Sequence, residues 1–309
     1  MILLKRTRNS FGAIDGSSIC ADVLARMSIG QIRAICLSTE TGLVACGDVF
    51  EVSTDPVPQE PFLVIQGDCG SIHGLGTEMQ SGTMCILGNA GDNTGRSMGG
   101  GALVIFGDAK DHLGSDMNEG LIYVTGNCRH GLASPRAGKK SGMRGGDILV
   151  ASSVGDRACE RMRRGTVFVA GDAGDYSASQ MIAGSLVVMG EMGSEWAGGM
   201  RRGSLILGRD CASHPSASLS DPRDFELSFL PLIWRHIEAL QNNAFAILQR
   251  ASAFASEGQQ RPIRELPLSL PFRIPRTRWV QRRIADLNCQ GRGEVLVLKR
   301  VSSLDYRAC

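Results

Sequence analysis

The sequence predicts a mainly β fold: a parallel, right-handed β-helix of about seven to eight coils with a 19-residue period. Seven of the twelve methionines recur at steps of 19 residues, broken by one step of 26. They are Met79, Met98, Met117, Met143, Met162, Met181 and Met200. Glycine stands three residues after each one, and a short run of β-branched and aliphatic residues follows, such as ALVIF at 102–106.

The length of the repeat indicates what each unit builds. Nineteen residues are too few for a strand–helix–strand crossover, and the runs lack the 3.6-residue period of a helix. They are enough for three short strands and three corners, which make one coil. Pairs such as Gly107-Asp108 predict corners, because glycine tolerates positive φ and an Asx side chain can bond its own backbone.

The regions outside the repeat predict three parts. Residues 1–57 are expected to form a small mixed domain that caps the first coil, and residues 58–220 the Gly-rich β-helix. The part 221–309 is expected to form an amphipathic helix over 231–256 and an extended tail from 259. The helix shows an apolar stripe made of Ile233, Ile237, Leu240, Ala244 and Ile247. The 26-residue step predicts a basic loop, GLASPRAGKKSG, at 131–142.

Composition excludes several classes of partner. Thirty-three basic and thirty-one acidic residues leave a net charge of +2, which favours neither nucleic acid nor a membrane surface as a partner. No apolar run is long enough for a secretory signal or a membrane span, so we expect a cytoplasmic protein. The ten cysteines include no CxxC pair and are interpreted as free thiols, and those in the repeat columns, Cys128 and Cys159, as packing residues.

The residues that catalysis needs do not gather into a recognisable pattern. The sequence shows no nucleophile with a base and no metal-ligand spacing, and AGKKSG at 137–142 lacks the spacing of a phosphate loop. We therefore assign no catalytic residue, no metal and no cofactor to this chain. His112 and His130 fall near one corner of adjacent coils, where a shared metal is the alternative to two exposed histidines.

An apolar strip is predicted on the outer face of the strands, because the residues between the inward positions are apolar too. Its members are Val104, Phe106, Tyr123, Leu149, Phe168, Val187 and Ile206. A bare strip of that size is unusual on a monomer, so something must cover it. The chain's own helix and a partner subunit are both candidates, and the strip is assigned to the subunit interface.

Basic residues cluster after the repeat methionines and in the inserted loop. The predicted basic ridge comprises Arg136, Lys139, Lys140, Arg144, Arg163, Arg164, Arg201 and Arg202, with Arg161 beside them. Such a ridge is either a solvated face or a seat for an acidic partner or a polyanionic ligand.

Four features together resemble one known family. They are Gly-rich coils of the form GxLxVxGDxG, a short N-terminal domain, FLPLIWRH at 229–236 after the coils, and the closing CQGRGEVLVL at 289–298. The chain is similar in these to the C subunit of formylmethanofuran dehydrogenase, and above all to its bacterial counterpart in the formyltransferase/hydrolase complex. The coil motif alone also resembles the C-terminal domain of the glutamate synthase large subunit.

The resemblance implies a non-catalytic structural subunit in tetrahydromethanopterin-linked one-carbon metabolism, as in methylotrophy. Sister hydrolase and formyltransferase subunits would be its partners. A methanofuran-like carrier, tetrahydromethanopterin and zinc would be used in those sister subunits, and the carrier's poly-glutamate tail gives the basic ridge a candidate ligand. The alternatives are a glutamate-synthase-like β-helix linker module and a β-helix binding protein for a polyanionic ligand.

Overall fold

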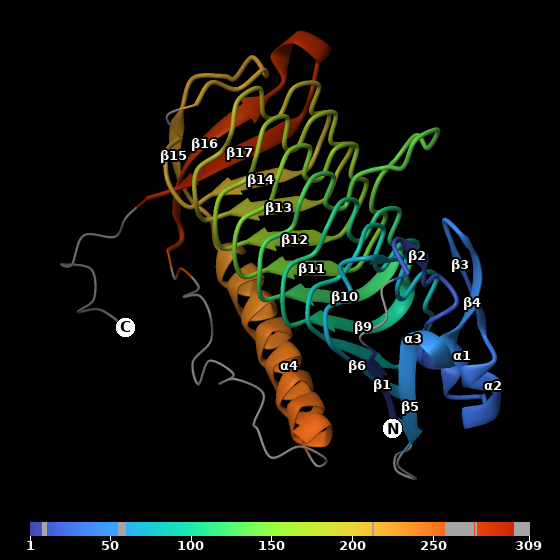
Figure 1. Cartoon of the computed structure of the whole chain (residues 1–309). Helices are drawn as coiled ribbons and strands as arrows, with labels where there is room; N and C mark the ends of the chain where they lie inside the picture. The colour runs from blue at the N-terminus through green and yellow to red at the C-terminus, as the bar shows by residue number, and fades with distance from the viewer. Residues whose placement is uncertain (8–10, 55–59, 212, 257–274, 276, 300–309) are drawn as a thin grey trace.

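The chain forms one large and one small β-sheet (Figure 1). The computed structural model describes residues 1–7, 11–54, 60–211, 213–256, 275 and 277–299. Among these residues, thirteen strands form the large sheet, in which most neighbours are parallel, and four form the small one. The prediction of a mainly β, parallel-rich chain is confirmed.

The repeat supplies eight neighbouring strands of the large sheet. In order these are β6 (Phe62–Gln66), β8 (Thr83–Leu87), β9 (Gly99–Ile105), β10 (Glu119–Val124), β11 (Asp147–Val150), β12 (Thr166–Val169), β13 (Ser185–Val188) and β14 (Ser204–Leu207). Residues 19 apart pair directly, as Val167 does with Leu186. Across the insertion Ile122 pairs with Ile148, so the longer step leaves the register intact.

The repeat units also bond to one another away from the large sheet. A second column of parallel bridges runs through Cys69, Ala90, Ala109, Cys128, Val154, Ala173 and Met192. At a further corner the backbone N–H of His112 donates to the carbonyl of His130 at 2.8 Å. Each unit therefore contacts its neighbours along several parts of its length.

The glycine three residues after each methionine is required by the backbone. Gly165 has φ +97°, and a Cβ placed on it would lie 2.5 Å from the carbonyl oxygen of Gly146 on the unit before. Any larger residue would combine a disfavoured conformation with a backbone clash. The glycine column is thus a consequence of close stacking.

The polar residues at the corners join one unit to the next. The Oδ1 of Asp108 accepts the backbone N–H of Asn127 at 2.7 Å, and Asp172 accepts that of Glu191 in the same way. Where the sequence has serine, Ser153 Oγ accepts from Asp172 N at 3.0 Å. We expected these side chains to cap their own corners; instead they bond 19 residues along the chain.

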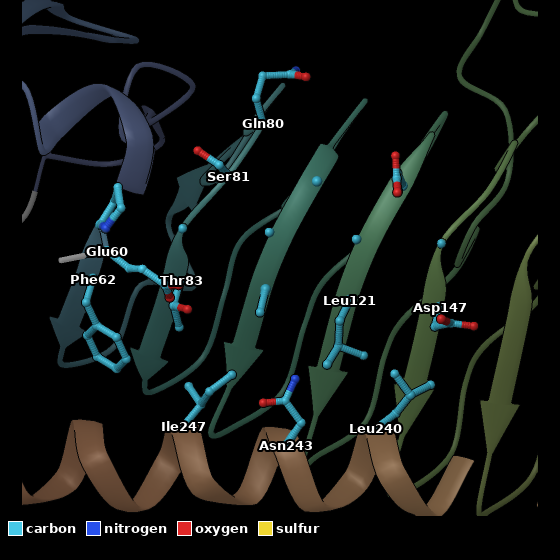
Figure 2. A pocket seen from close by; sticks show the side chains of 18 of the residues that line it. Glu60, Phe62, Gln80, Ser81, Thr83, Leu121, Asp147, Leu240, Asn243 and Ile247 are labelled. Carbon is cyan, nitrogen blue, oxygen red and sulfur yellow. The ribbon is translucent and has the colours of Figure 1, made fainter. Parts of the chain in front are cut away.

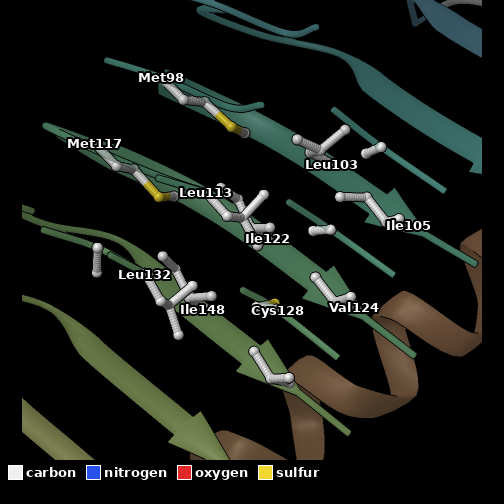
Figure 3. Close-up of a cluster of buried hydrophobic side chains, with 14 of the residues drawn as sticks. Met98, Leu103, Ile105, Leu113, Met117, Ile122, Val124, Cys128, Leu132 and Ile148 are labelled. Atoms are coloured by element: carbon white, nitrogen blue, oxygen red, sulfur yellow. The ribbon is translucent and has the colours of Figure 1, made fainter. Parts of the chain in front are cut away.

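The interior is filled by columns of identical or similar side chains (Figure 3). Met98 and Met117 lie beside Leu103, Ile122 and Ile148, and all five are fully buried. The seven repeat methionines are all buried, as the packing interpretation predicted. An unbranched thioether fills such an interior easily.

The N-terminal residues extend the large sheet. β1 (Ile2–Arg6) pairs parallel with β6, and β5 (Phe50–Thr54) pairs antiparallel with β1 at the edge. The small sheet has the order β4 (Gly42–Ala45), β3 (Cys36–Thr39), β2 (Ile14–Asp15) and β7 (Ile72–His73). Three short helices, α1 (Ala21–Leu24), α2 (Ile29–Arg33) and α3 (Cys46–Val49), complete this end. Strands from both sides of residue 57 share each sheet, so the segment caps the stack by continuing it.

The C-terminal residues cap the other end. β15 (Arg223–Glu226) and β16 (Trp279–Ala285) are antiparallel, and β17 (Gly293–Leu298), which follows the 3₁₀ helix Leu287–Cys289, pairs parallel with β14. Of the predicted extended tail, β16 and β17 form two antiparallel strands of the large sheet, and 259–274 lie outside the described residues. Burial raises the pKa of Asp286, but backbone N–H donors from Gly199, Ser218 and Asn288 outweigh it and leave that pKa lowered.

Helix α4 (Leu230–Ser256) crosses the outer face of the strands along the stack (Figure 1). Its side chains form one buried cluster with the apolar strip: Leu230, Trp234, Ile237, Ala244, Leu248 and Ala251 pack with Val104, Tyr123, Leu149, Phe168, Val187 and Ile206. Phe106 packs partly buried against them. The assignment of the strip to the subunit interface is therefore corrected: the chain's own helix covers it. No helix of the described residues is long and apolar enough to span a membrane.

Candidate functional site: a groove beside α4 and two basic surfaces

One buried polar residue lies within the contact between α4 and the strip. Gln241 is 1% exposed and lies on the buried side of the helix, between Ile237 and Ala244 in the sequence. Neither of its amide atoms has a hydrogen-bond partner among the residues that the structure describes. A buried unpaired amide costs free energy, so this helix is held less tightly than its apolar area alone would suggest.

A groove of about 970 Å³ runs between α4 and the first halves of the strands (Figure 2). Backbone atoms of the glycine column form part of its wall, and Leu240, Asn243 and Ile247 project into it from the helix. Charged groups at its rim are Glu60, Glu119, Asp147 and Arg250. This groove was not predicted from the sequence; the combination of a side-chain-free glycine column and a neighbouring amphipathic helix was the signal for it.

Two ring contacts connect the helix to the strands beside the groove. His236 Nε2 lies 3.0 Å from Asp147 Oδ1, and the guanidinium of Arg250 stacks on Phe62 with 4.4 Å between the carbon and the ring centroid. Both contacts hold α4 against the strands, so His236 and Arg250 are assigned a structural role.

The structure divides the predicted basic ridge into two surfaces. Arg144, Arg163, Arg164, Arg201 and Arg202 are exposed on the segment before the strands, and we call them the basic column. The N–H of Arg163 donates to Met143 O, and that of Arg292 donates to Arg201 O, so the exposed Arg292 extends the column. Among the described residues none of the five forms an ion pair.

The remaining predicted basic residues belong to the inserted loop. Arg136 and Lys139, together with Arg161, line a pocket of about 440 Å³, which we call the loop pocket; Lys140 is exposed beside it. Arg157, His112 and His130 line it too, and Glu160 is the one carboxylate among its lining residues. The sequence predicted His112 and His130 near one corner, and the loop pocket brings both together with the arginines.

The two histidines of the loop pocket are already engaged. His130 Nδ1 accepts the backbone N–H of Asp156 at 3.1 Å, within a column in which His73, Asp92, Asp111, Asp156 and Asp175 each accept from the next unit. His112 Nδ1 lies 3.3 Å from Ser134 Oγ. No group of three potential metal ligands occurs within the described parts of the chain.

The cysteines of the interior are unsuited to nucleophilic chemistry. Cys85, Cys128 and Cys159 are buried, and burial raises the pKa of each thiol well above its ordinary value. A neutral buried thiol is a packing residue, as expected from the sequence.

Comparison with known proteins supports the resemblance drawn from the four sequence features. One chain of the formyltransferase/hydrolase complex from Methylorubrum extorquens, whose crystal structure contains methylofuran, superimposes with a TM-score of 0.77. The match covers 96% of this chain and 100% of that one at 25% identity. The sequence is also 33% identical over 78 residues to the C subunit of the tungsten-containing formylmethanofuran dehydrogenase 2 of Methanothermobacter wolfeii. That match spans 25% of this chain and 29% of the relative. No protein-family model matches the sequence.

Proposed function

We propose that this chain is a structural, non-catalytic subunit of a formyltransferase/hydrolase complex, on which the hydrolase and formyltransferase subunits assemble. The observation that carries the proposal is the shared fold over 96% of the chain with a member of such a complex. Two further observations support it: burial raises the pKa of the Cys128 and Cys159 thiols, and Nδ1 of His112 and of His130 is hydrogen-bonded within the chain.

The architecture suits that role. We infer that the repeat region winds as a right-handed parallel β-helix, supported by the second column of bridges and the corner hydrogen bonds between units. Bonding between units at several places makes a rigid rod with the capped ends described above, and a rigid rod holds two partners at a constant separation. The methanofuran-like carrier, tetrahydromethanopterin and zinc would be used in the sister subunits.

The first prediction concerns activity. The purified chain alone is expected to show no formyl-transfer or hydrolase turnover, whereas co-expression with the sister subunits should restore it. Activity assays of the lone chain and of the co-expressed subunits measure the turnover. Affinity purification of the tagged chain, followed by identification of the proteins that bind it, identifies the partners. Turnover by the lone chain would contradict the non-catalytic role. Partners that carry flavin and iron–sulfur clusters would instead support the glutamate-synthase-like linker.

The basic column is the second part of the proposal. Five exposed arginines without carboxylate partners among the described residues form a positive surface. We propose that this surface holds an acidic sister subunit or the carrier's glutamate tail, because such a surface attracts anions over about a Debye length.

Charge reversal tests the basic column. The double variants Arg163→Glu/Arg164→Glu and Arg201→Glu/Arg202→Glu are expected to weaken assembly or raise the carrier's apparent KM, more strongly at low salt than at high salt. Arg26→Glu/Arg235→Glu, two exposed arginines elsewhere on the chain, is the matched control. Equal behaviour of the three variants in assembly and kinetics would show that the column is only a solvated face.

A further inference from the structure

The loop pocket gathers cationic side chains. Its cationic side chains are Arg136, Lys139, Arg157 and Arg161; among the described residues Glu160 is the one carboxylate that lines it, and Asp116 pairs with Arg136 from outside it. A solvated surface carries both signs interspersed, so this excess within one concave volume of about 440 Å³ indicates a site for negative charge.

Two of the guanidinium groups are held in place through their inner nitrogens. Arg136 Nε donates to Asp116 Oδ2 at 2.8 Å, and Arg161 Nε donates to Gln180 Oε1 at 2.8 Å. Asp116 is 4% exposed, so the first of these anchors is buried. Anchoring through Nε orients the plane of a guanidinium and leaves its terminal nitrogens for a planar oxyanion.

Arg157 is oriented differently. Its guanidinium stacks over the ring of Tyr176 at 5.8 Å, and its Nη1 lies 3.7 Å from Glu160 Oε2. Arg161 lies 3.9 Å from the other oxygen of the same carboxylate. One carboxylate is therefore shared by two guanidinium groups, which leaves uncompensated positive charge between them.

His130 adds a further donor. The backbone N–H of Asp156 is an obligate donor to His130 Nδ1, so in the neutral ring the proton lies on Nε2, which is then a donor. The Asp156 carboxylate lies 3.3 Å from Nδ1 and pairs with the ring only when the ring is protonated. At His112, Ser134 Oγ already donates to Gly131 O at 2.6 Å, so Nδ1 of that ring must be the donor to the hydroxyl.

We propose that the loop pocket binds a small oxyanion, the carboxylate or phosphate group of a small molecule. Guanidinium forks, an ammonium group and an imidazole N–H provide the charge-assisted hydrogen bonds that such a group requires. None of its lining residues belongs to the basic column, and the site does not depend on the proposed scaffold role, since it uses only this chain's residues.

Titration calorimetry on the full chain tests the proposal, with inorganic phosphate and succinate as probes. One probe is expected to bind saturably with one site per chain. Arg161→Ala should weaken that binding about tenfold or more, the loss expected for a charge-assisted hydrogen bond. Tighter binding of phosphate would identify a phosphorylated ligand, and tighter binding of succinate a carboxylic acid.

The control removes a neighbouring charge outside the pocket. Arg129 is 60% exposed, directly precedes His130 in the sequence and does not line the pocket. Arg129→Ala should therefore change the affinity by less than about twofold. Should Arg161→Ala misfold, the exposed Lys139→Ala replaces it and should also weaken binding. The proposal is overturned if neither probe binds saturably, or if the pocket variants and Arg129→Ala lose affinity equally.

Discussion

Replacing Gly165 by alanine is expected to lower the free energy of unfolding of the chain by about 2–5 kcal/mol. Gly165 has φ +97°, where an alanine is strained, and the new Cβ would lie 2.5 Å from the carbonyl oxygen of Gly146. The neighbouring unit would have to move away, which would weaken the hydrogen bonds of β12 to β11 and β13. The shift of the urea unfolding midpoint is the measurement.

Gly138→Ala separates the two causes. Gly138 has φ +81°, but no atom of the described residues lies within 4 Å of the place where its Cβ would be. This control carries the conformational penalty alone, about 1–2 kcal/mol. Equal losses in the two variants would mean that close stacking of the units does not require the glycine column.

Phe168→Ala should lower the free energy of unfolding of the isolated chain by about 3–5 kcal/mol, because a fully buried ring would leave a cavity. Phe168 is 0% exposed in the cluster that joins the strip to α4. The effect should be seen without any sister subunit present. Urea unfolding of the purified chain, followed by circular dichroism, measures it.

Phe225→Ala is the matched control for that substitution. Phe225 lies on the edge strand β15 and is 37% exposed, so its truncation should cost about 1 kcal/mol. If Phe168→Ala left the midpoint unchanged but prevented co-purification of the sister subunits, α4 would not cover the strip in solution. The strip would then be an interface after all.

The repeat could be predicted because it leaves a direct mark on the sequence. Met, Gly and the strand run recur together, and the structure places each set in its own column, as for Met98 with Met117. The inward residues Leu103 and Ile122 could be assigned by alternation, since successive side chains of a strand point to opposite faces.

Side chains facing outward could not be assigned in the same way. Alternation shows that Phe168 leaves the interior of the stack, but it carries no information on what covers it. The buried face of α4 is also rotated relative to the predicted apolar stripe. Trp234 is buried and its Nε1 donates to Thr277 O at 3.2 Å, while Ile233 is only partly buried. Gln241 could not be predicted as a buried residue, because the buried face of a helix is predicted from the spacing of its apolar residues and glutamine is polar.

The last strand and the loop pocket were missed for different reasons. In β17, Gly293 is in register with Gly203, but Gln290 stands where the methionine of the repeat would be. The methionine spacing therefore predicts one strand too few. The loop pocket joins residues of the inserted loop to residues of the following unit. Only the fold of that loop, on which the periodicity carries no information, brings Arg136 and Arg161 into one site.

Helix α4 places a limit on how this chain can change in length. Its buried positions, from Leu230 to Ala251, recur about every 3.5 residues, or about 5.3 Å, close to the ~4.8 Å between neighbouring strands. Insertion of a whole repeat unit would therefore leave one strand of the strip bare unless the helix grew by three to four residues as well. Duplication of a unit, otherwise the simplest route to a longer stack, therefore requires a second change, in α4, which lies outside the repeat. The length of the helix thus matches the number of units that it covers.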